Sequence, residues 1–499
     1  MPNKNRSKIE NSNWFIFVVF VIYIVVAYKS SGYHHEDEHY QIIEFANYKL
    51  GILRIDQLAW EFEAKIRPGF QPFICFCLLK LFNWIGVTDG YNIAFLLRAI
   101  SAIVSIFVIK TFVNAYKSTI AEKLQSSFVL LSFLLWFLPY INVRFSSESW
   151  SGLMFMIVLA FIQKTRYKEN LRKYILLGIL LGISILFRYQ SALLVTGVLL
   201  WLILVYKINP KNLIGLIASL GLTISGGILI DFWMYGELTL SIYNYFFVNL
   251  VDGVSSNFGV SPFYQYLYYI LFRSGPFGIF ILVSFVVLLY YQPKNIMLWT
   301  VIPFLFVHSI IPHKELRFLY PIANLVPIFL ILSYQGVYKR YKLSRWRIIG
   351  SVGLVFLVVL NIVGLVAIAS TGAGSNKTVV TEWIHRQYGD ENLNIIIVNG
   401  QNPFIDWGPP KNSYYSSSKL KLDHISSIWQ DDFVRHKKDG QVNLLVISYN
   451  DFTGSRADRL LRRFHIVEVY RNIPEFLIYL YEIYNPSLND FGLKVYEFK

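Results

Sequence analysis

Residues 34–39 form a dense run of ionisable side chains near the start of the chain, His34-His35-Glu36-Asp37-Glu38-His39. A carboxylate with charged neighbours can serve as the general base that removes a proton from a hydroxyl group. A charge run after a first apolar segment is also typical of a solvated linker. Amphipathic helical spacing continues to residue 68 and favours an ordered structure at the membrane interface instead. The members of this continuation are Gln41, Glu44, Asp56, Trp60, Glu61, Arg67 and Pro68.

A second cluster lies between two apolar runs, at residues 312–318, and reads Pro312-His313-Lys314-Glu315-Leu316-Arg317-Phe318. An arginine fork can bind two phosphate oxygens and a lysine can add a point charge, while Glu315 can hold either in place. These residue types therefore suit a phosphate group. The alternative is an anchor for lipid headgroups, which is commoner on the inner side of a membrane, where the leaflet is anionic.

Weaker signals occur at the ends of other apolar runs, at Arg144, Glu148, Arg188 and Asp231. Single arginines often cap helices or reach from a helix end toward water, so these residues matter mainly for their position. The sequence contains no H-E-x-x-H, C-x-x-C, P-loop or G-x-G-x-x-G pattern. The acidic run could bind a divalent cation through oxygen ligands, but no spacing requires one, so neither a metal nor a cofactor is expected.

The elements that position these residues are apolar. The chain has 499 residues, of which 55% are hydrophobic and 15% are charged, and lipid must be the solvent for most of that apolar surface. The basic residues behind the net charge of +15 stand in short clusters between apolar runs. This arrangement indicates membrane topology and argues against a nucleic-acid partner.

Twelve apolar runs are candidates for membrane spans. If all of them crossed, basic clusters at 164–173 and 339–347 would lie outside, against the positive-inside rule. Run 70–85 is short and contains Lys80 and Asn83, so we expect it to be an interfacial helix and eleven runs to cross. The runs are 14–29, 70–85, 91–113, 127–143, 149–163, 174–187, 190–206, 212–230, 275–291, 296–311, 319–335 and 348–370.

This topology predicts an outer loop at 30–90 and brings the charged span ends to one face of the membrane. Charges near hydrocarbon are costly, about 2.5–3.5 kcal/mol each at the bilayer centre and less at its edge, so several on one face suggest a polar cavity. After residue 370 the composition changes to polar loops between short elements. The β-rich runs are 393–398, 442–448, 465–470 and 476–481, and the helix-like stretches are 379–388 and 454–464. We therefore expect a transmembrane module at 1–370 and a small soluble α/β domain at 371–499 on the outer side.

In their order along the chain, several segments resemble motifs of glycosyltransferase family 22, the mannosyltransferases that build glycosylphosphatidylinositol anchors and dolichol-linked oligosaccharides. The match to the family's H-K-E-x-R-F motif, at residues 313–318, is the most specific. Glu36 departs from the family by replacing a proline. The matching segments are His35-Glu36-Asp37-Glu38 with Tyr40-Gln41 and Glu44, Trp60-Glu61-Phe62, Ile66-Arg67-Pro68, Arg144 to Glu148, Asp231 to Gly236, Asn249 to Tyr264 and His313 to Phe318.

The resemblance implies a helical membrane protein of the GT-C fold that uses a lipid-phosphate sugar on the outer or luminal face. It implies that Asp37 is the base, with Glu38 beside it. Within the family, the resemblance is nearest to the branch that adds the third mannose of the glycosylphosphatidylinositol core. The expected donor-binding residues are Arg188, His313, Lys314, Glu315 and Arg317. The expected acceptor-binding or loop-ordering residues are His35, Gln41, Glu44, Trp60, Glu61, Arg67, Arg144, Glu148 and Asp231.

The function predicted in this way is inverting transfer of mannose from a polyprenyl- or dolichyl-phosphate to a hydroxyl of a glycan or glycolipid, which forms an α-linkage. The bilayer, the lipid-linked donor and the acceptor are the expected partners. Two alternatives stay open: another donor sugar on the same fold, and a transporter or flippase for a lipid-linked glycan. The expected location is a bacterial inner membrane with the site outside, or an endoplasmic reticulum membrane with a luminal site.

Overall fold

The protein folds into two compact units. The computed structural model describes residues 13–165, 170–341, 347–374, 377–389, 391–400, 402–404, 415, 419–428, 431–449, 455–474, 477–478 and 492–499. The first unit comprises Met1–Ile24, Tyr40–Lys80 and Arg98–Leu365, and the second comprises Val25–His39, Leu81–Leu97 and Val366–Lys499. The expected domain boundary near residue 370 stays a prediction, because the second unit also contains two earlier stretches, one of which carries the acidic run.

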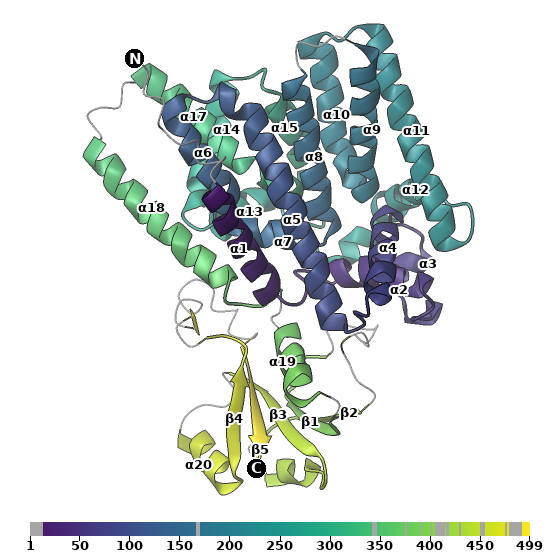
Figure 1. The fold of residues 1–499 in the computed structure, drawn as a ribbon, viewed down its shortest axis with the longest axis vertical. Coiled ribbons are helices and arrows are strands. Elements are labelled where there is room, and N and C mark those ends of the chain that lie inside the picture. The colour runs from purple at the N-terminus through teal and green to yellow at the C-terminus, as the bar shows by residue number, and fades with distance from the viewer. Residues whose placement is uncertain are drawn as a thin grey trace. The chain divides into compact units, whose positions relative to one another are not determined.

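The first unit is built almost entirely of helices (Figure 1). Several of them, including α1, α4, α5 and α18, continue into the second unit. The helices are α1 (Asn13–Lys29), α2 (Glu44–Lys49), α3 (Trp60–Glu63), α4 (Phe70–Trp84), α5 (Gly90–Tyr116), α6 (Glu122–Leu134), α7 (Phe137–Val143), α8 (Ser147–Lys164), α9 (Leu171–Phe187), α10 (Ala192–Leu200), α11 (Pro210–Tyr235), α12 (Ser241–Phe246), α13 (Gln265–Arg273), α14 (Phe277–Tyr291), α15 (Ile296–Ile310), α16 (Tyr320–Ala323), α17 (Val326–Tyr341) and α18 (Arg347–Ile368).

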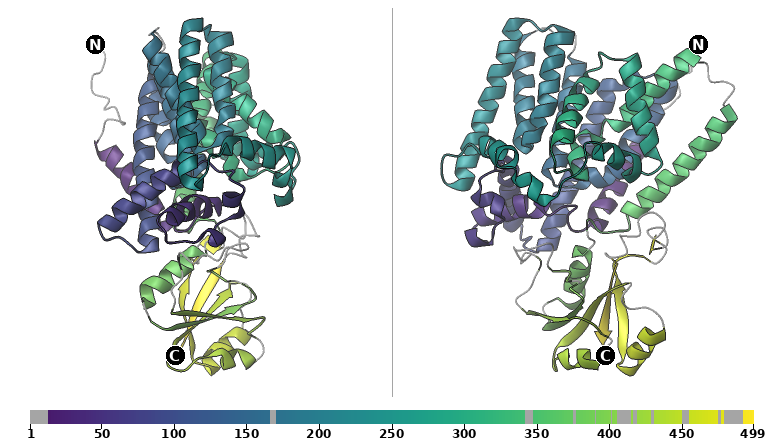
Figure 2. Two further views of the ribbon diagram at one scale, coloured as in Figure 1. Left: turned by 90° about the vertical axis from the view of Figure 1, so that its right-hand side faces the viewer. Right: turned by 180° about the vertical axis from the view of Figure 1, so that it is seen from behind.

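Helices α8, α9 and α11 pack side by side (Figure 2). Small residues allow the close approach: a Cβ on Gly182 of α9 would lie 2.6 Å from the Cβ of Thr223 in α11. Close packing through small residues is the usual way in which apolar helices associate in lipid, where there is no hydrophobic drive between them. This packing sets the positions of the start of α8 and of the ends of α9 and α11 relative to one another. These three helix ends carry side chains of the candidate site.

Two apolar runs that the sequence suggested as single spans are bent in the structure. Helices α6 and α7 meet at 51°, and the segments Leu316–Ala323 and Val326–Arg340 meet at 63°. At the first bend Asn361 accepts a hydrogen bond from the backbone of Trp136 (2.9 Å) and donates one to the carbonyl of Leu134 (2.7 Å). A side chain that takes over backbone hydrogen bonds in this way lets a helix kink.

By length and composition, three described helical stretches could cross a membrane, or five if each bent pair counts as one span. Shorter apolar helices, α4 among them, accompany these. The chain is thus a multi-pass membrane protein, while the count of eleven spans and the interfacial position of α4 stay predictions. The three long stretches are Gly90–Thr119, Tyr189–Tyr206 and Pro210–Tyr235.

The second unit contains a five-stranded sheet with the strand order β2-β1-β3-β5-β4. Strands β2, β1 and β3 run parallel, while β5 pairs antiparallel with β3 and β4. Apolar residues on one face of the sheet pack against α19, and those on the other face pack against α20. The elements are α19 (Thr378–Tyr388), β1 (Leu393–Val398), β2 (Leu420–Ile425), β3 (Val442–Ser448), α20 (Ser455–Arg463), β4 (Ile466–Arg471) and β5 (Leu493–Phe498).

Most of the elements expected after residue 370 coincide with observed ones. Strands β1 and β3 have the expected bounds, α19 begins one residue earlier than expected, and α20 and β4 differ from the expected 454–464 and 465–470 by one residue at each end. The strand expected at 476–481 is wrong at Leu477 and Ile478, which are helical, and its other residues lie outside the described ones. Strands β2 and β5 were not expected, because the polar and charged residues in each interrupt the apolar pattern.

Candidate active site

Glu148 lies at the centre of a buried charge cluster in the first unit. It stands in the first turn of α8, where Ser146 caps the helix by accepting a hydrogen bond from the backbone of Ser149 (3.2 Å). The partial positive charge of a helix N-terminus stabilises a carboxylate at this place. Glu148 is only 2% exposed, so its charge depends on partners inside the protein.

Two arginines share Glu148. Arg188 donates to Oε1 of Glu148 at 2.7 Å, and Arg317 donates to the same oxygen at 2.9 Å. Arg188 follows the last residue of α9 in extended conformation, and Arg317 lies in the short helix Leu316–Leu319. Both guanidinium groups also lie over the ring of Phe318, at 5.1 and 5.3 Å from its centroid. Two cations predicted to bind the donor phosphate are therefore held side by side.

Glu315 extends the cluster toward His313. It accepts hydrogen bonds from Nε and Nη2 of Arg317 and forms a 2.7 Å hydrogen bond with Nε2 of His313. The bond to Glu315 raises the pKa of His313 above its ordinary value. With His313 protonated, the two arginines and the histidine outnumber the two carboxylates by one positive charge, which favours an anionic ligand.

Lys314 contacts backbone carbonyls rather than the carboxylates of this charge cluster. Its ammonium donates to the carbonyl of Ile311 at 2.7 Å and to that of Ser261 at 3.0 Å. Desolvation lowers the pKa of Lys314. The described contacts of Lys314 tie the loop before Leu316 to the segment at Ser261, and its predicted contact with the donor phosphate stays a prediction.

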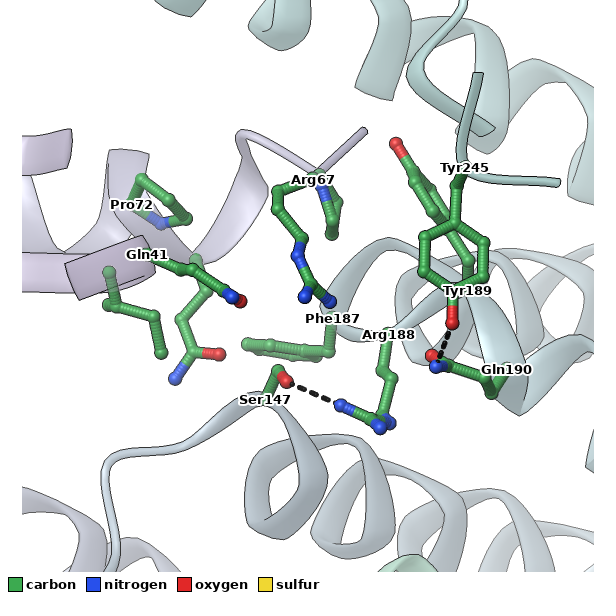
Figure 3. A pocket seen from close by; sticks show the side chains of 12 residues that line it. Gln41, Arg67, Pro72, Ser147, Phe187, Arg188, Tyr189, Gln190 and Tyr245 are labelled. Atoms are coloured by element: carbon green, nitrogen blue, oxygen red, sulfur yellow. Dashed lines mark hydrogen bonds between the residues drawn. The ribbon is translucent and has the colours of Figure 1, made fainter. Parts of the chain in front are cut away.

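A pocket of about 400 Å³, including its opening to solvent, lies beside the cluster. Figure 3 shows Gln41 and Arg67 entering it from the segment between α1 and α4, Ser147 from the start of α8, and Arg188 from the end of α9. The hydroxyl of Ser147 accepts a hydrogen bond from Arg188 at 3.1 Å. The pocket is lined by Gln41, Ile42, Arg67, Pro68, Gln71, Pro72, Ser147, Phe187, Arg188, Tyr189, Gln190 and Tyr245.

Gln71 is the most unusual residue of the lining. Its side chain is 1% exposed, and neither atom of its amide has a hydrogen-bond partner within the described part of the chain. An unsatisfied buried polar group costs about 1–3 kcal/mol, so it needs an explanation.

The last turn of α11 holds the loop that carries Arg67. Asp231 accepts hydrogen bonds from the backbone of Gly69 (2.7 Å) and from the hydroxyl of Tyr189 (3.2 Å). Tyr235, one turn later, donates its hydroxyl to the carbonyl of Arg67 (2.8 Å). The described contacts of Asp231 are those of a loop-ordering residue, one of the two roles expected for it.

Other residues of the outer loop contact one another. Glu61 accepts hydrogen bonds from Gln41 at 3.0 Å and from Arg67 at 3.5 Å. Trp60 stacks on Phe258, with 6.1 Å between the ring centroids. Glu44 is buried in α2. The loop is therefore ordered, and Gln41 and Arg67 present their side chains to the pocket.

The acidic run lies in the second unit and forms a helical turn. The backbone of Glu38 donates to the carbonyl of His35 at 3.1 Å, and the backbone of His34 donates to the carboxylate of Glu38 at 3.2 Å. Nδ1 of His35 lies 3.4 Å from a carboxylate oxygen of Asp37 and 3.3 Å from one of Glu36. Asp37 is partly buried and keeps 17% of its side chain exposed.

The remaining predicted residue, Arg144, is fully buried with its guanidinium 5.3 Å from the ring centroid of Tyr140. Within the described residues, no group of three or more His, Cys, Asp or Glu side chains could hold a metal ion. Sequence reasoning missed several lining residues because, apart from Ser147 in the segment Arg144 to Glu148, they stand in or between apolar runs with no motif around them. They are Gln71, Ser147, Tyr189, Gln190 and Tyr245.

Two solved structures align with most of this chain. ArnT from Cupriavidus metallidurans bound to undecaprenyl phosphate has a TM-score of 0.46 and 12% identity and covers 98% of both chains. An oligosaccharyltransferase from Archaeoglobus fulgidus has a TM-score of 0.48 and 12% identity, over 92% of this chain and 69% of the other. Likenesses this distant support no conclusion about the site.

Several curated proteins are similar in sequence. GPI mannosyltransferase 3 of Candida albicans is 25% identical over 68% of this chain and 66% of its own length. Human GPI alpha-1,2-mannosyltransferase 3 is 23% identical over 62% of this chain and 55% of its own. A probable Dol-P-Man:Man(7)GlcNAc(2)-PP-Dol alpha-1,6-mannosyltransferase of Schizosaccharomyces pombe is 31% identical over 34% of this chain and 31% of its own length. The chain covers slightly under two thirds of the first of these relatives and less of the other two.

A family model matches residues 14–390, which is more than half of the 499 residues. The match includes the acidic turn, the lining of the pocket and the arginine cluster. It confirms the family that the ordered motifs predicted. This chain belongs to the Alg9-like mannosyltransferase family, glycosyltransferase family 22.

Proposed function

We propose that this protein transfers mannose from a polyprenyl- or dolichyl-phosphate to a hydroxyl group of a glycan or glycolipid. The observation that carries the proposal is the pair of buried arginines on Glu148 beside a polar pocket, in a chain of a mannosyltransferase family. The GT-C fold and a site on the outer or luminal face belong to the same proposal. The positive-inside distribution of the loop charges supports that side.

The arginine cluster would bind the phosphate of the donor. Arginine presents paired N–H groups that match phosphate oxygens, and such charge-assisted bonds are stronger than neutral ones. Glu148 holds Arg188 and Arg317 side by side by accepting both on one oxygen atom, so the guanidinium groups are in place before the donor arrives. Preorganised donors of this kind stabilise the charge that develops on the leaving phosphate.

The reaction is a single displacement at C1 of the mannose. The acceptor oxygen forms a bond to C1 while the bond from C1 to the phosphate oxygen breaks, and the bonding electrons leave with the lipid phosphate. Asp37 takes the proton of the acceptor hydroxyl. Attack from the face opposite the phosphate inverts a β-linked donor to an α-linked product, with Glu38 and His35 keeping the turn around Asp37 in shape.

The pocket lining suits the sugar of the donor. Hydroxyl groups both donate and accept hydrogen bonds, and so do the amides of Gln71, Gln41 and Gln190. A mannose seated there would supply the partners that Gln71 lacks. The relatives named for GPI mannosyltransferase 3 suggest a glycolipid acceptor and an α-1,2 linkage. The name of the fission yeast relative specifies dolichyl-phosphate mannose, which suggests the donor.

Two variants test the proposal by different measurements. Asp37→Asn should lower kcat for transfer of radiolabelled mannose from a lipid-phosphate donor by at least about 10²-fold, as expected for loss of a general base, while leaving the donor bound. Arg188→Gln should instead weaken donor binding by about 10-fold or more, since a bond to a charged group contributes about 1.5–3 kcal/mol. Arg188→Lys keeps the charge and loses the paired N–H groups of the guanidinium. Its affinity for the donor should lie between those of the wild type and Arg188→Gln.

Full transfer activity in Asp37→Asn would exclude Asp37 as the base. If the purified wild-type protein moved a lipid-linked glycan across vesicles without forming a new glycosidic bond, the transporter alternative would be correct.

A further inference from the structure

The C-terminal segment contacts the acidic turn within the second unit. The backbone of Ala373 donates to the carbonyl of Ser31 at 2.9 Å. The hydroxyl of Ser31 donates in turn to the carboxylate of Glu382, which lies in α19. These contacts join positions 342 and 351 residues apart, just before the run Glu36-Asp37-Glu38. The start of the turn is therefore fixed by residues that follow the last apolar run.

Two glycines permit this close contact. Gly374 has φ +55°, and a Cβ there would overlap the carbonyl oxygen of Tyr33 and lie 3.1 Å from that of His34. Gly32 has φ +90°, and its Cβ would lie 2.9 Å from the Cβ of Thr378. Both backbones adopt conformations that favour glycine, and both lie directly against the opposite segment.

The other end of the acidic turn is held by aromatic rings. The ring of His39 is buried, with its centroid 5.7 Å from that of Tyr33 and 5.4 Å from that of Tyr415. Tyr415 stacks on Tyr91 at 4.6 Å and accepts a hydrogen bond from its hydroxyl through its backbone carbonyl, at 3.2 Å. The C-terminal segment thus contacts the sequence on both sides of Asp37.

Helix α19 also contacts the residues around the start of α5. Nε2 of His385 lies 2.7 Å from a carboxylate oxygen of Asp89, and Arg386 donates to the side chain of Asn92 at 3.4 Å. Exposed pairs of this kind contribute little to stability. Their value is to orient α19, while the packing at Gly374 and His39 determines where the turn lies.

We propose that α19 together with Ala373, Gly374 and Tyr415, here named the C-terminal clamp, positions Asp37 for proton transfer. The clamp residues are positioning residues, because they act through the backbone of the turn. This inference rests on the proposed function in one respect, that Asp37 is the base. It assigns a part in the reaction to residues that follow the last apolar run. A base displaced by about 1 Å can cost about 10²-fold in rate, so small movements of the turn matter.

The glycines provide a matched pair of variants for the test. Gly374→Ala places a methyl group against Tyr33, whereas Gly389→Ala introduces the same methyl group at nearly the same φ, +54°, with no atom within 4 Å among the described residues. Both variants place alanine at a positive φ, where the backbone is strained, and only the first also places the methyl group against the turn. Both are made in the full-length protein in detergent.

Two measurements are made on each variant: hydrogen–deuterium exchange of peptides that cover residues 31–39, and kcat and KM for a lipid-phosphate mannose donor. Gly374→Ala should exchange faster in these peptides and lower kcat by about 10-fold or more, with KM for the donor within about 2-fold of wild type. Gly389→Ala should match the wild type in both. Ser31→Ala removes one hydrogen bond and should raise the exchange rate and lower kcat by smaller amounts. It replaces Gly374→Ala in the test if that variant fails to fold.

Unchanged exchange in Gly374→Ala and Ser31→Ala would overturn the clamp, and so would faster exchange with an unchanged kcat. Equal effects of Gly374→Ala and Gly389→Ala would also overturn it. The proposed function fails separately: if Asp37→Asn is fully active while Gly374→Ala still frees the turn and lowers kcat, the clamp positions a group other than Asp37.

Discussion

Glu148 accepts two guanidinium groups on one oxygen atom, and this arrangement brings together residues that are 40 and 169 positions away in the sequence. The residue types at each of these places were predictable, because Arg188 and Arg317 stand where apolar runs end. Their common partner was not predictable, since Glu148 was expected only to order a loop or bind the acceptor. A buried carboxylate between two buried arginines is stable only because each charge is compensated.

At the same scale, His313 gives the protein a pH dependence. The hydrogen bond to Glu315 raises the pKa of His313, so the folded protein keeps this charge to a higher pH than an ordinary histidine with a pKa of about 6.5. The stabilisation is complete below the ordinary pKa and is lost as the pH rises through the raised one. We expect KM for the donor to increase over that upper range, because a positive charge beside the phosphate is lost.

The measurement is KM for the donor against pH in three proteins. In Glu315→Gln the midpoint should move to lower pH, since the group that raises the pKa of His313 has lost its charge. In His313→Gln the step should disappear. A step of unchanged midpoint in His313→Gln would show that another group titrates.

At the scale of elements, the last turn of α11 determines the position of the outer loop. Asp231 and Tyr235 are four residues apart and so lie on one face of the helix, from which they reach Gly69 and Arg67. A Cβ on Gly69 would lie 3.1 Å from Oδ1 of Asp231 and 3.3 Å from the carbonyl of Ile230. This turn of α11 therefore leaves little room for a side chain at position 69.

Gly69→Ala should destabilise the protein by about 1–3 kcal/mol through overpacking, and it should reduce donor binding because Arg67 moves with the loop. Thermal unfolding in detergent and KM for the donor measure the two effects. The control is Gly226→Ala in α11, where no atom of the described residues lies within 4 Å of the added methyl group. Equal unfolding temperatures for both variants would contradict this account of the loop.

At the scale of the whole molecule, the position of α4 decides how many times the chain crosses the membrane. The sequence predicts that residues on both sides of α4 lie on the outer face, because only then do the basic loops all lie inside. Helix α4 has 15 residues, slightly short of the roughly 20 that a span needs.

Single cysteines test this topology in a protein whose Cys75 and Cys77 have been replaced by alanine. Ile52→Cys and Thr88→Cys flank α4 at exposed positions, and Ser118→Cys, also exposed, marks the expected inner side. A membrane-impermeant maleimide added outside should label the first two and not the third. Opposite labelling of Ile52→Cys and Thr88→Cys would mean that α4 crosses.

The sequence by itself determined that most of this protein lies in lipid. It also determined the order of the apolar runs, the family and the chemistry of the charged segments, because each of these depends on residue type and local spacing. Only the tertiary structure decided which charges meet. It placed Arg188 and Arg317 on Glu148, buried the amide of Gln71 in the lining of a pocket, and bent the run at 127–143, where the backbone of Trp136 donates a hydrogen bond to the distant Asn361. It also brought α19 to the acidic turn around Asp37. Contacts of this kind join residues from 40 to 351 positions apart, and no local pattern encodes such pairings.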